Sequence, residues 1–151
     1  MTATVRRVLP PVWLLLALLA SYAFDRKLPL AEIFREPWNL AGFLPLALGC
    51  VMSAISALAF RRAGTPVVPF EVSKKLVIGG WYRVTRNPMY LGLALVQAGV
   101  GTLLGSLGAL LPLPVLIAIL HFRFIRGEER FLEEIFGDEY RSYRARVRRW
   151  I

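Results

Sequence analysis

The sequence predicts an all-α integral membrane protein: a helical bundle with about four transmembrane helices and an amphipathic helix at the C-terminus. Three observations predict this fold class. Apolar residues make up 56% of the 151-residue chain and the mean hydropathy is +0.53, whereas soluble domains are roughly 45–50% apolar. The apolar residues form long stretches without charge, as membrane spans do. The cations concentrate on alternate segments between these stretches.

The first predicted span is Val8–Phe24, just long enough to cross a bilayer. Pro10 and Pro11 fit its first helical turn, where a missing N–H matters least. No small-residue cleavage site follows, so we expect a retained span and not a signal peptide. A mixed-charge loop, residues 25–39, comes next, with Trp38 as an interfacial anchor.

The second predicted span, Leu40–Phe60, has 21 residues and no charge. Its many small residues favour close helix packing over lipid contact. Arg61 and Arg62 end it. Residues 63–85 are too polar to span and predict an ordered interfacial loop, with a short extended piece at 76–78.

A charge-free insert, residues 87–122, supplies the last two spans. As one helix it would be about 54 Å long, far more than the hydrocarbon core. The break is predicted at 105–108, helped by the prolines that follow, so the insert becomes a helical hairpin. We expect its second helix to continue past Phe122 into the headgroups. Gly101-x-x-x-Gly105 suits helix packing within or between chains, and the oligomeric state stays open.

The C-terminal tail is predicted to be helical, amphipathic and basic. Gly137 is expected as a C-cap and Asp138 as the N-cap of the final helix. Apolar side chains then recur at helical spacing: Tyr140, Tyr143, Val147 and Trp150. Such a helix is suited to lie on anionic lipid.

The distribution of cations predicts the orientation. Four spans place two, six and eight cations, 16 in all, on the side of both termini, against three in the 25–39 loop. By the positive-inside rule both termini are cytoplasmic, in an inner or plasma membrane.

The length fits one domain, 1–151, with two N-terminal spans in 1–62 and the chemically equipped half in 63–151. The net charge of +9 alone suits nucleic acid or an anionic membrane. No stacking platform or basic recognition helix stands apart from the apolar bulk, so we expect no nucleic acid. Cys50 and His121 are single residues of their kind, so no disulfide and no metal site is expected.

The sequence contains few of the familiar catalytic motifs. His121 has no nucleophile beside it and no phosphate-binding glycine loop occurs. The remaining candidate is the segment 86–90, which would face Glu128 and Glu129 across the hairpin. Those carboxylates also suit a helix N-terminus without further function, and Arg86 could anchor the interface. As a site, the group suits a cationic or zwitterionic ligand with ribose hydroxyls, beside an apolar cleft and without a metal.

Three motifs in residues 65–151 carry a family resemblance. They read Leu76-Val77-Ile78-Gly79-Gly80-Trp81-Tyr82-Arg83, then Arg86-Asn87-Pro88-Met89-Tyr90-Leu91-Gly92, then Glu128-Glu129-x-x-Leu132-x-x-x-Phe136-Gly137-x-x-Tyr140-x-x-Tyr143-x-x-x-Val147. In this order the motifs resemble the membrane methyltransferases that include isoprenylcysteine carboxyl methyltransferases and phospholipid N-methyltransferases. Asn87 stands where the family more often has histidine.

The resemblance implies S-adenosylmethionine as cofactor, bound by 63–151, and methyl transfer to a lipophilic or membrane-delivered carboxylate, thiol or amine. It assigns catalytic roles to Arg86 and Glu128, and a guiding role for an anionic substrate to Arg123 and Arg126. The residues that it places around the cofactor are Lys75, Leu76, Val77, Tyr82, Asn87, Pro88, Met89, Tyr90, Glu128 and Glu129.

Two other functions are compatible with the sequence. A non-catalytic membrane scaffold would use the basic tail to dock lipid or a partner, but would not need the 87–88 and 128–129 pairs. A reductase of the same architecture would need a nicotinamide-phosphate site, for which no separate basic pocket is evident.

Overall fold

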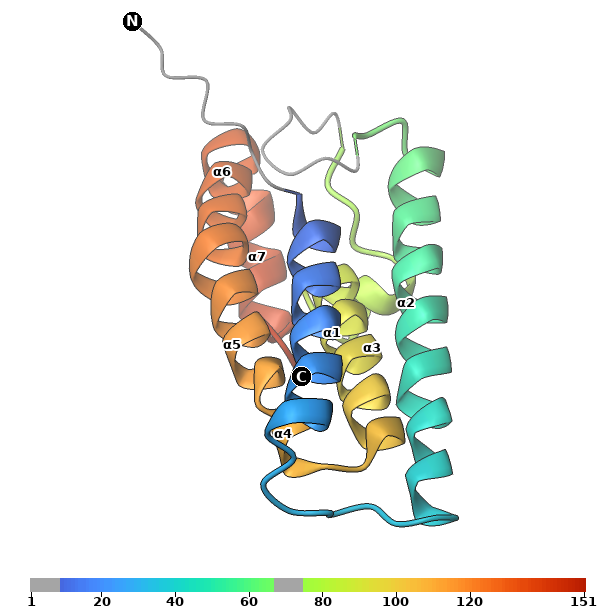
Figure 1. Ribbon diagram of the computed structural model, residues 1–151. Coiled ribbons are helices and arrows are strands. Elements are labelled where there is room, and N and C mark those ends of the chain that lie inside the picture. The colour runs from blue at the N-terminus through green and yellow to red at the C-terminus, as the bar shows by residue number, and fades with distance from the viewer. Residues whose placement is uncertain (1–8, 67–74) are drawn as a thin grey trace, which may run out of the picture.

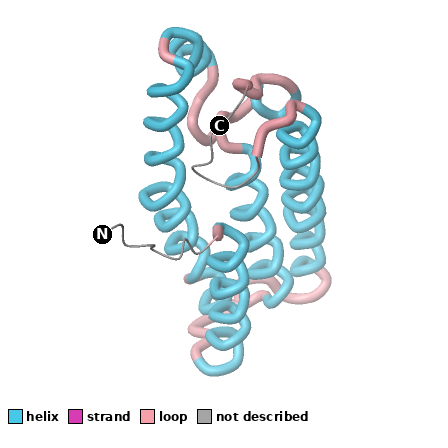
Figure 2. The backbone as a smooth tube through the Cα atoms, turned by 90° about the horizontal axis from the view of Figure 1, so that it is seen from above, coloured by secondary structure: helices cyan, strands magenta, loops and turns pink. Residues whose placement is uncertain are grey.

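The computed structural model describes residues 9–66 and 75–151, and in them helices joined by loops make up the fold (Figures 1 and 2). Within these ranges the one β feature is an isolated antiparallel bridge between Glu32 and Ser106. The all-α prediction is therefore confirmed. The helices are α1 (Pro10–Lys27), η1 (Trp38–Gly42), α2 (Phe43–Arg62), η2 (Gly80–Arg83), α3 (Pro88–Leu104), α4 (Leu107–Leu110), α5 (Pro112–Ile119), the π-helix η3 (Leu120–Ile125), α6 (Arg126–Phe136) and α7 (Asp138–Arg146).

The long helices alternate in direction along the chain, and α3 lies at the centre, packed on α1 and α2 (Figure 1). Segments α4 to α6 follow one another as a 30-residue helical stretch, Leu107–Phe136. The buried core joins α3, α5 and η3, with Trp13 of α1 packed against it. Its members are Tyr90, Leu116, Leu120, Phe124 and Ile125.

Glycines bring the backbones of α2 and α3 into contact. A Cβ added to Gly99 would lie 2.6 Å from the amide nitrogen of Leu46, and one added to Gly49 would lie 2.8 Å from that of Val96. Both distances are too short for a side chain. The expected close packing of the second span is confirmed, and it takes place against α3.

The predicted hairpin forms, with its reversal at Gly105 and Ser106. Gly105 has a φ of +88°, which favours glycine, and the Ser106 side chain caps α4 by accepting from the amide of Ala109 at 3.1 Å. The prolines that follow do not add to the break. Pro112 begins α5, where no intrahelical N–H is needed. The second helix does continue beyond Phe122, as expected.

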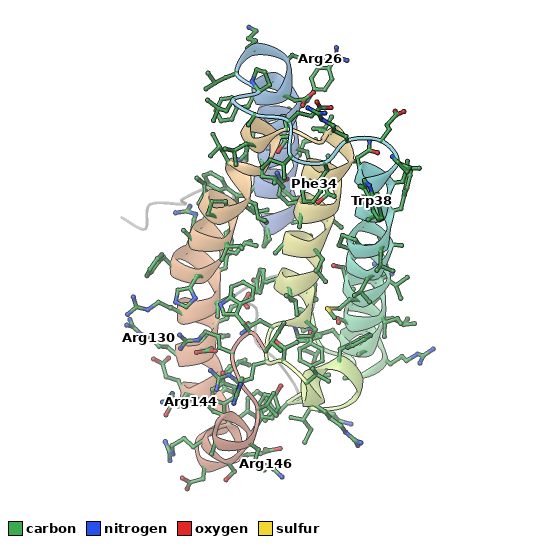
Figure 3. The ribbon with its side chains drawn as sticks, turned by 90° about the horizontal axis from the view of Figure 1, so that it is seen from below. Arg26, Phe34, Trp38, Arg130, Arg144 and Arg146 are labelled. Carbon is green, nitrogen blue, oxygen red and sulfur yellow. The ribbon has the colours of Figure 1, made fainter. Side chains whose placement is uncertain are left out.

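The two ends of the bundle differ in character (Figure 3). At one end the 28–37 loop packs on the hairpin turn: the amides of Ile33 and Phe34 donate to the carbonyl of Gly105. At the other end α2, α3 and α6 meet the η2 segment and α7. Arg26 and Trp38 mark the first end in Figure 3, and Arg144 marks the second.

Two helical stretches among the described residues are long and apolar enough to cross a membrane: Trp38–Arg62 and Leu107–Phe136. α3 is apolar but shorter, and α1 ends in charged residues. The count of four spans therefore stays a prediction. Val8 of the first predicted span and the cations Arg6, Arg7 and Lys74 lie outside the described residues.

Two local predictions are corrected, and a third stays a prediction. The third is the short extended piece at residues 76–78, which lie outside the helices and pair with no described segment. Gly137, with a φ of +51°, ends α6 as expected, but it also holds the N-cap position of α7, where we had placed Asp138. α7 ends at Arg146, so Val147 and Trp150 do not continue its apolar face.

Candidate active site

A cavity of about 500 Å³ lies at the end of the bundle where α2, α3, α6 and α7 meet. Most of its lining is apolar, and its charged residues come from segments far apart in the sequence. The lining residues are Leu9, Pro10, Pro11, Ser53, Ala54, Ala57, Phe60, Pro66, Lys75, Leu76, Val77, Tyr82, Arg86, Asn87, Met89, Tyr90, Leu93, Glu128, Glu129, Phe131, Leu132, Tyr140 and Tyr143.

Glu128 lines this cavity with a carboxylate that no described cation neutralises. Its hydrogen-bond partner among the described residues is the Tyr90 hydroxyl, which donates to Oε1 at 2.7 Å. Tyr90 lies in the first turn of α3 and Glu128 in the first turn of α6, so the pair joins the two helices of the hairpin. Glu128 is half-buried, and a carboxylate that is partly removed from water without a counter-ion is costly. The cavity is therefore suited to a ligand that carries positive charge or hydroxyl donors.

Glu129, the next residue, is fully engaged within the protein. Its Oε1 accepts from Arg86 Nη2 at 2.9 Å and its Oε2 accepts from Arg149 Nη2 at 2.7 Å. The side chains of Arg86 and Glu129 are only 9% and 7% exposed. Each pair makes several hydrogen bonds, which is the geometry a buried ion pair needs to offset the loss of hydration.

Backbone carbonyls near the C-terminus also bind the ion cluster that Arg86, Glu129 and Arg149 form. Arg86 Nη1 donates to the carbonyls of Arg144 and Val147 at 3.0 and 3.2 Å, and the Arg86 amide donates to the carbonyl of Arg148 at 2.9 Å. All three side-chain nitrogens of Arg86 therefore donate within the protein.

α7 contributes two buried tyrosines to the same region, Tyr140 and Tyr143. The Tyr143 hydroxyl donates to the carbonyl of Tyr82 at 2.7 Å. Burial, the largest cause, raises the pKa of Tyr143 to about 12, so the phenol is a neutral donor at physiological pH. The apolar face of α7 is thus covered by the protein and not free for lipid.

The structure brings most of the predicted site residues together. Nine of the ten residues expected around the cofactor line the cavity; the exception is Pro88, buried as the first residue of α3. Arg86, expected as catalytic, also lines it. Arg123 and Arg126 do not line the cavity and are exposed. Their role as substrate guides stays a prediction.

Sequence reasoning missed the contributions of α2 and of the C-terminus. α2 lines the cavity with Phe60 and with three small side chains that lie on one face of the helix: Ser53, Ala54 and Ala57. That spacing was visible, but the same small residues also suited helix packing. Nothing in the sequence distinguished Arg149 as a site residue, because it is one of several arginines in a segment that was predicted to be a single basic helix.

The model of the phospholipid methyltransferase family matches residues 38–139, more than half of the chain. The chain belongs to this family. An uncharacterized protein of Haemophilus influenzae is 41% identical over 63 residues, which are 42% of this chain and all of that protein. A probable protein-S-isoprenylcysteine O-methyltransferase of rice, Oryza sativa subsp. indica, is 27% identical over 134 residues, covering 84% of this chain and 70% of its own.

The protein-S-isoprenylcysteine O-methyltransferase B of Arabidopsis thaliana is 26% identical over 117 residues, 75% of this chain and 59% of the plant enzyme. No solved structure matches the chain. The protein is therefore a methyltransferase, and its long apolar helices agree with the membrane character of the family. Its chemistry needs a methyl donor.

Proposed function

We propose that this methyltransferase transfers a methyl group from S-adenosylmethionine to a lipophilic acceptor delivered from the membrane. The observation that carries the proposal is the Glu128 carboxylate, held by Tyr90 and without an ion-pair partner among the described residues, in a cavity whose lining is mostly apolar. Its volume falls in the range of about 300–1,000 Å³ typical of small-molecule sites.

The residues present fit such a cofactor. Its amino group and ribose hydroxyls are donors that the carboxylate of Glu128 would accept, and its adenine ring and aliphatic methylene groups suit apolar walls such as Leu76, Val77 and Met89. When bound, S-adenosylmethionine supplies an electrophilic methyl group on a sulfonium. Tyr90 orients Glu128 through its hydroxyl, so the carboxylate keeps one direction in the cavity.

In-line methyl transfer disperses charge and gains most from accurate positioning in a dry site. The chain contributes to both: Phe60, Leu93 and Leu132 give the cavity apolar walls, and the hydrogen bond from Tyr90 fixes Glu128 across the helical hairpin. No strong acid or base is required by this chemistry. That agrees with a cavity whose lining contains no histidine or cysteine among the described residues.

Arg86 is proposed as a positioning residue. Its nitrogens already donate to Glu129 and to the C-terminal carbonyls. A substrate carboxylate would have to displace these bonds. Arg86 thus supports the proposed catalytic group Glu128 indirectly, through the adjacent Glu129.

The acceptor is proposed to be lipophilic because the walls toward α1 and α2 are apolar. Leu9, Pro10 and Phe60 form part of this side, with the small side chains of Ala54 and Ala57 leaving room between them. Of the two cations that line the cavity, Arg86 is ion-paired, whereas Lys75 forms no ion pair with a described residue. A carboxylate, thiol or amine acceptor is compatible with this arrangement.

Calorimetric titration of the detergent-purified protein with S-adenosylmethionine and S-adenosylhomocysteine tests the proposal. We expect binding in the micromolar range, lost in Glu128→Ala. Glu134→Ala is the matched control, because Glu134 is exposed on the same helix. If folded wild-type protein binds neither compound, or Glu128→Ala binds as well as the control, the proposal is wrong; the first result would favour a non-catalytic scaffold.

A further inference from the structure

The residues after α7 form an unpredicted contact with the cavity wall. We infer that residues 147–150, called here the C-terminal strap, position the start of α3 for cofactor binding, with Arg149 as the positioning residue. The inference rests on the proposed function and deepens it, because it assigns a role to a segment that does not itself line the cavity.

The strap leaves α7 in an extended conformation at Val147 and lies beside the three residues that precede α3. Val147 has φ −119° and ψ 131°. The carbonyl of Arg149 accepts from the Thr85 hydroxyl at 3.1 Å and from the Asn87 side-chain amide at 3.0 Å. With the bond between the Arg86 amide and the Arg148 carbonyl, each residue of 85–87 is bound to the strap.

At the start of α3 these bonds take the place of the side-chain hydrogen bond that usually caps a helix N-terminus. Asn87 is the N-cap residue of α3, yet its side chain makes no capping bond and donates to the strap instead. Pro88 follows and has no N–H to donate. The direction in which α3 begins, and with it the place of Tyr90, therefore depends on where the strap holds 85–87.

Two side chains anchor the strap to the long helical stretch Leu107–Phe136. Arg149 binds Glu129 through Nε and Nη2. Trp150 lies over His121 of η3, with ring centroids 6.5 Å apart and planes within 17°, and its Nε1 lies 3.4 Å from Nδ1. The strap thus links the start of α3 to the long helix that carries Glu128.

This linkage controls the relative placement of the two groups that the proposed site uses. Tyr90 comes from α3 and Glu128 from α6, and a hydrogen bond of 2.7 Å joins them. Binding sites require their groups to be held within about 0.5 Å of the productive geometry by supporting contacts. Loss of Arg149 would leave the buried Glu129 with Arg86 as its one remaining partner and would free the strap at its centre.

The test compares Arg149→Ala, Arg149→Lys and a matched control, Arg146→Ala. Arg146 is exposed, three residues earlier in the chain, and bonds within α7 to the Ser142 carbonyl. Affinity for S-adenosylmethionine is measured by calorimetry well below the unfolding transition, together with amide exchange of the peptide that contains Arg86. We expect Arg149→Ala to weaken binding at least tenfold and to speed exchange of that peptide, Arg149→Lys to restore most of both, and the control to match wild type.

A merely structural role would lower the unfolding temperature of Arg149→Ala but leave the affinity of the folded protein unchanged. Affinity within twofold of wild type would overturn the inference while leaving the proposed function intact. Absence of binding by wild-type protein would overturn both. If Arg149→Ala does not fold, Trp150→Ala carries the test, since it keeps the ion pair with Glu129: we expect at least threefold weaker binding, and no change would overturn the inference.

Discussion

Glu128 and Glu129 are neighbours of the same type with opposite situations. Glu128 faces the cavity and is bound by Tyr90, whereas Glu129 is paired with Arg86 and Arg149. The motif predicted that both would be near a ligand, but not which one is free. That difference depends on Arg149, which reaches the site only because the chain folds back after α7.

Removal of the Glu129 carboxylate is expected to destabilise the protein. Glu129→Ala leaves two arginines, one of them nearly buried, without their anion, and breaking a buried pair in this way costs about 3 kcal/mol. Chemical unfolding in detergent measures the change. Glu134→Ala, on the exposed face of α6, should stay within about 0.5 kcal/mol of wild type. Equal stability of the two variants would show that the ion cluster contributes little.

Loss of the Tyr90 hydroxyl is expected to affect ligand binding more than stability. Tyr90→Phe keeps the ring packed on Phe124 but removes the donor to Glu128. Hydrogen bonds to carboxylates contribute about 1.5–3 kcal/mol, so we expect about tenfold weaker binding of S-adenosylmethionine. Calorimetry on both proteins measures this. An unchanged affinity would mean that Glu128 needs no support from Tyr90.

At the scale of elements, the contact of α2 with α3 depends on the absence of side chains. Gly99→Ala is expected to destabilise the fold by about 1–3 kcal/mol, because its Cβ would meet the backbone of α2 at under 3 Å. Gly79→Ala is the control: it lies outside the helices, and an added Cβ there meets no described atom within 4 Å. Thermal unfolding of both variants measures the difference. A Gly99→Ala protein as stable as the control would mean that the two helices can separate at no cost.

The helices were more predictable than the segments after them. Charge-free stretches and a glycine at the reversal are local signals, and they placed the hairpin and the continuation of its second helix. The pattern of Tyr140, Tyr143, Val147 and Trp150 favoured one continuous helix just as clearly. It failed at Val147 because the backbone carbonyls there bind Arg86, which is 61 residues away in sequence. A contact of that kind has no local signature.

The whole molecule has a polar end, which holds the cavity, and an end formed by the 28–37 loop and the hairpin turn. Arg130, Arg144 and Arg146 mark the first in Figure 3, and Arg26 with Phe34 marks the second. The positions of the apolar stretches in the sequence already predicted that the polar segments would lie at two opposite ends of the bundle. The sequence also placed most cations at the end that holds the cavity. The geometry agrees with that separation, but the side of the membrane follows from charge alone.

The cavity end is therefore predicted to be cytoplasmic, and cysteine labelling in intact cells tests it. In a Cys50→Ser background, Ile33→Cys places an exposed thiol at the loop end and Arg146→Cys places one at the cavity end. We expect a membrane-impermeant maleimide to label Ile33→Cys from outside, and Arg146→Cys only after permeabilisation, because segments rich in arginine stay on the inner side. Both variants must still bind S-adenosylmethionine like wild type. The reverse labelling pattern would place the cofactor site outside, where the cell holds little of that donor, and would contradict the orientation together with the proposed supply of the methyl group.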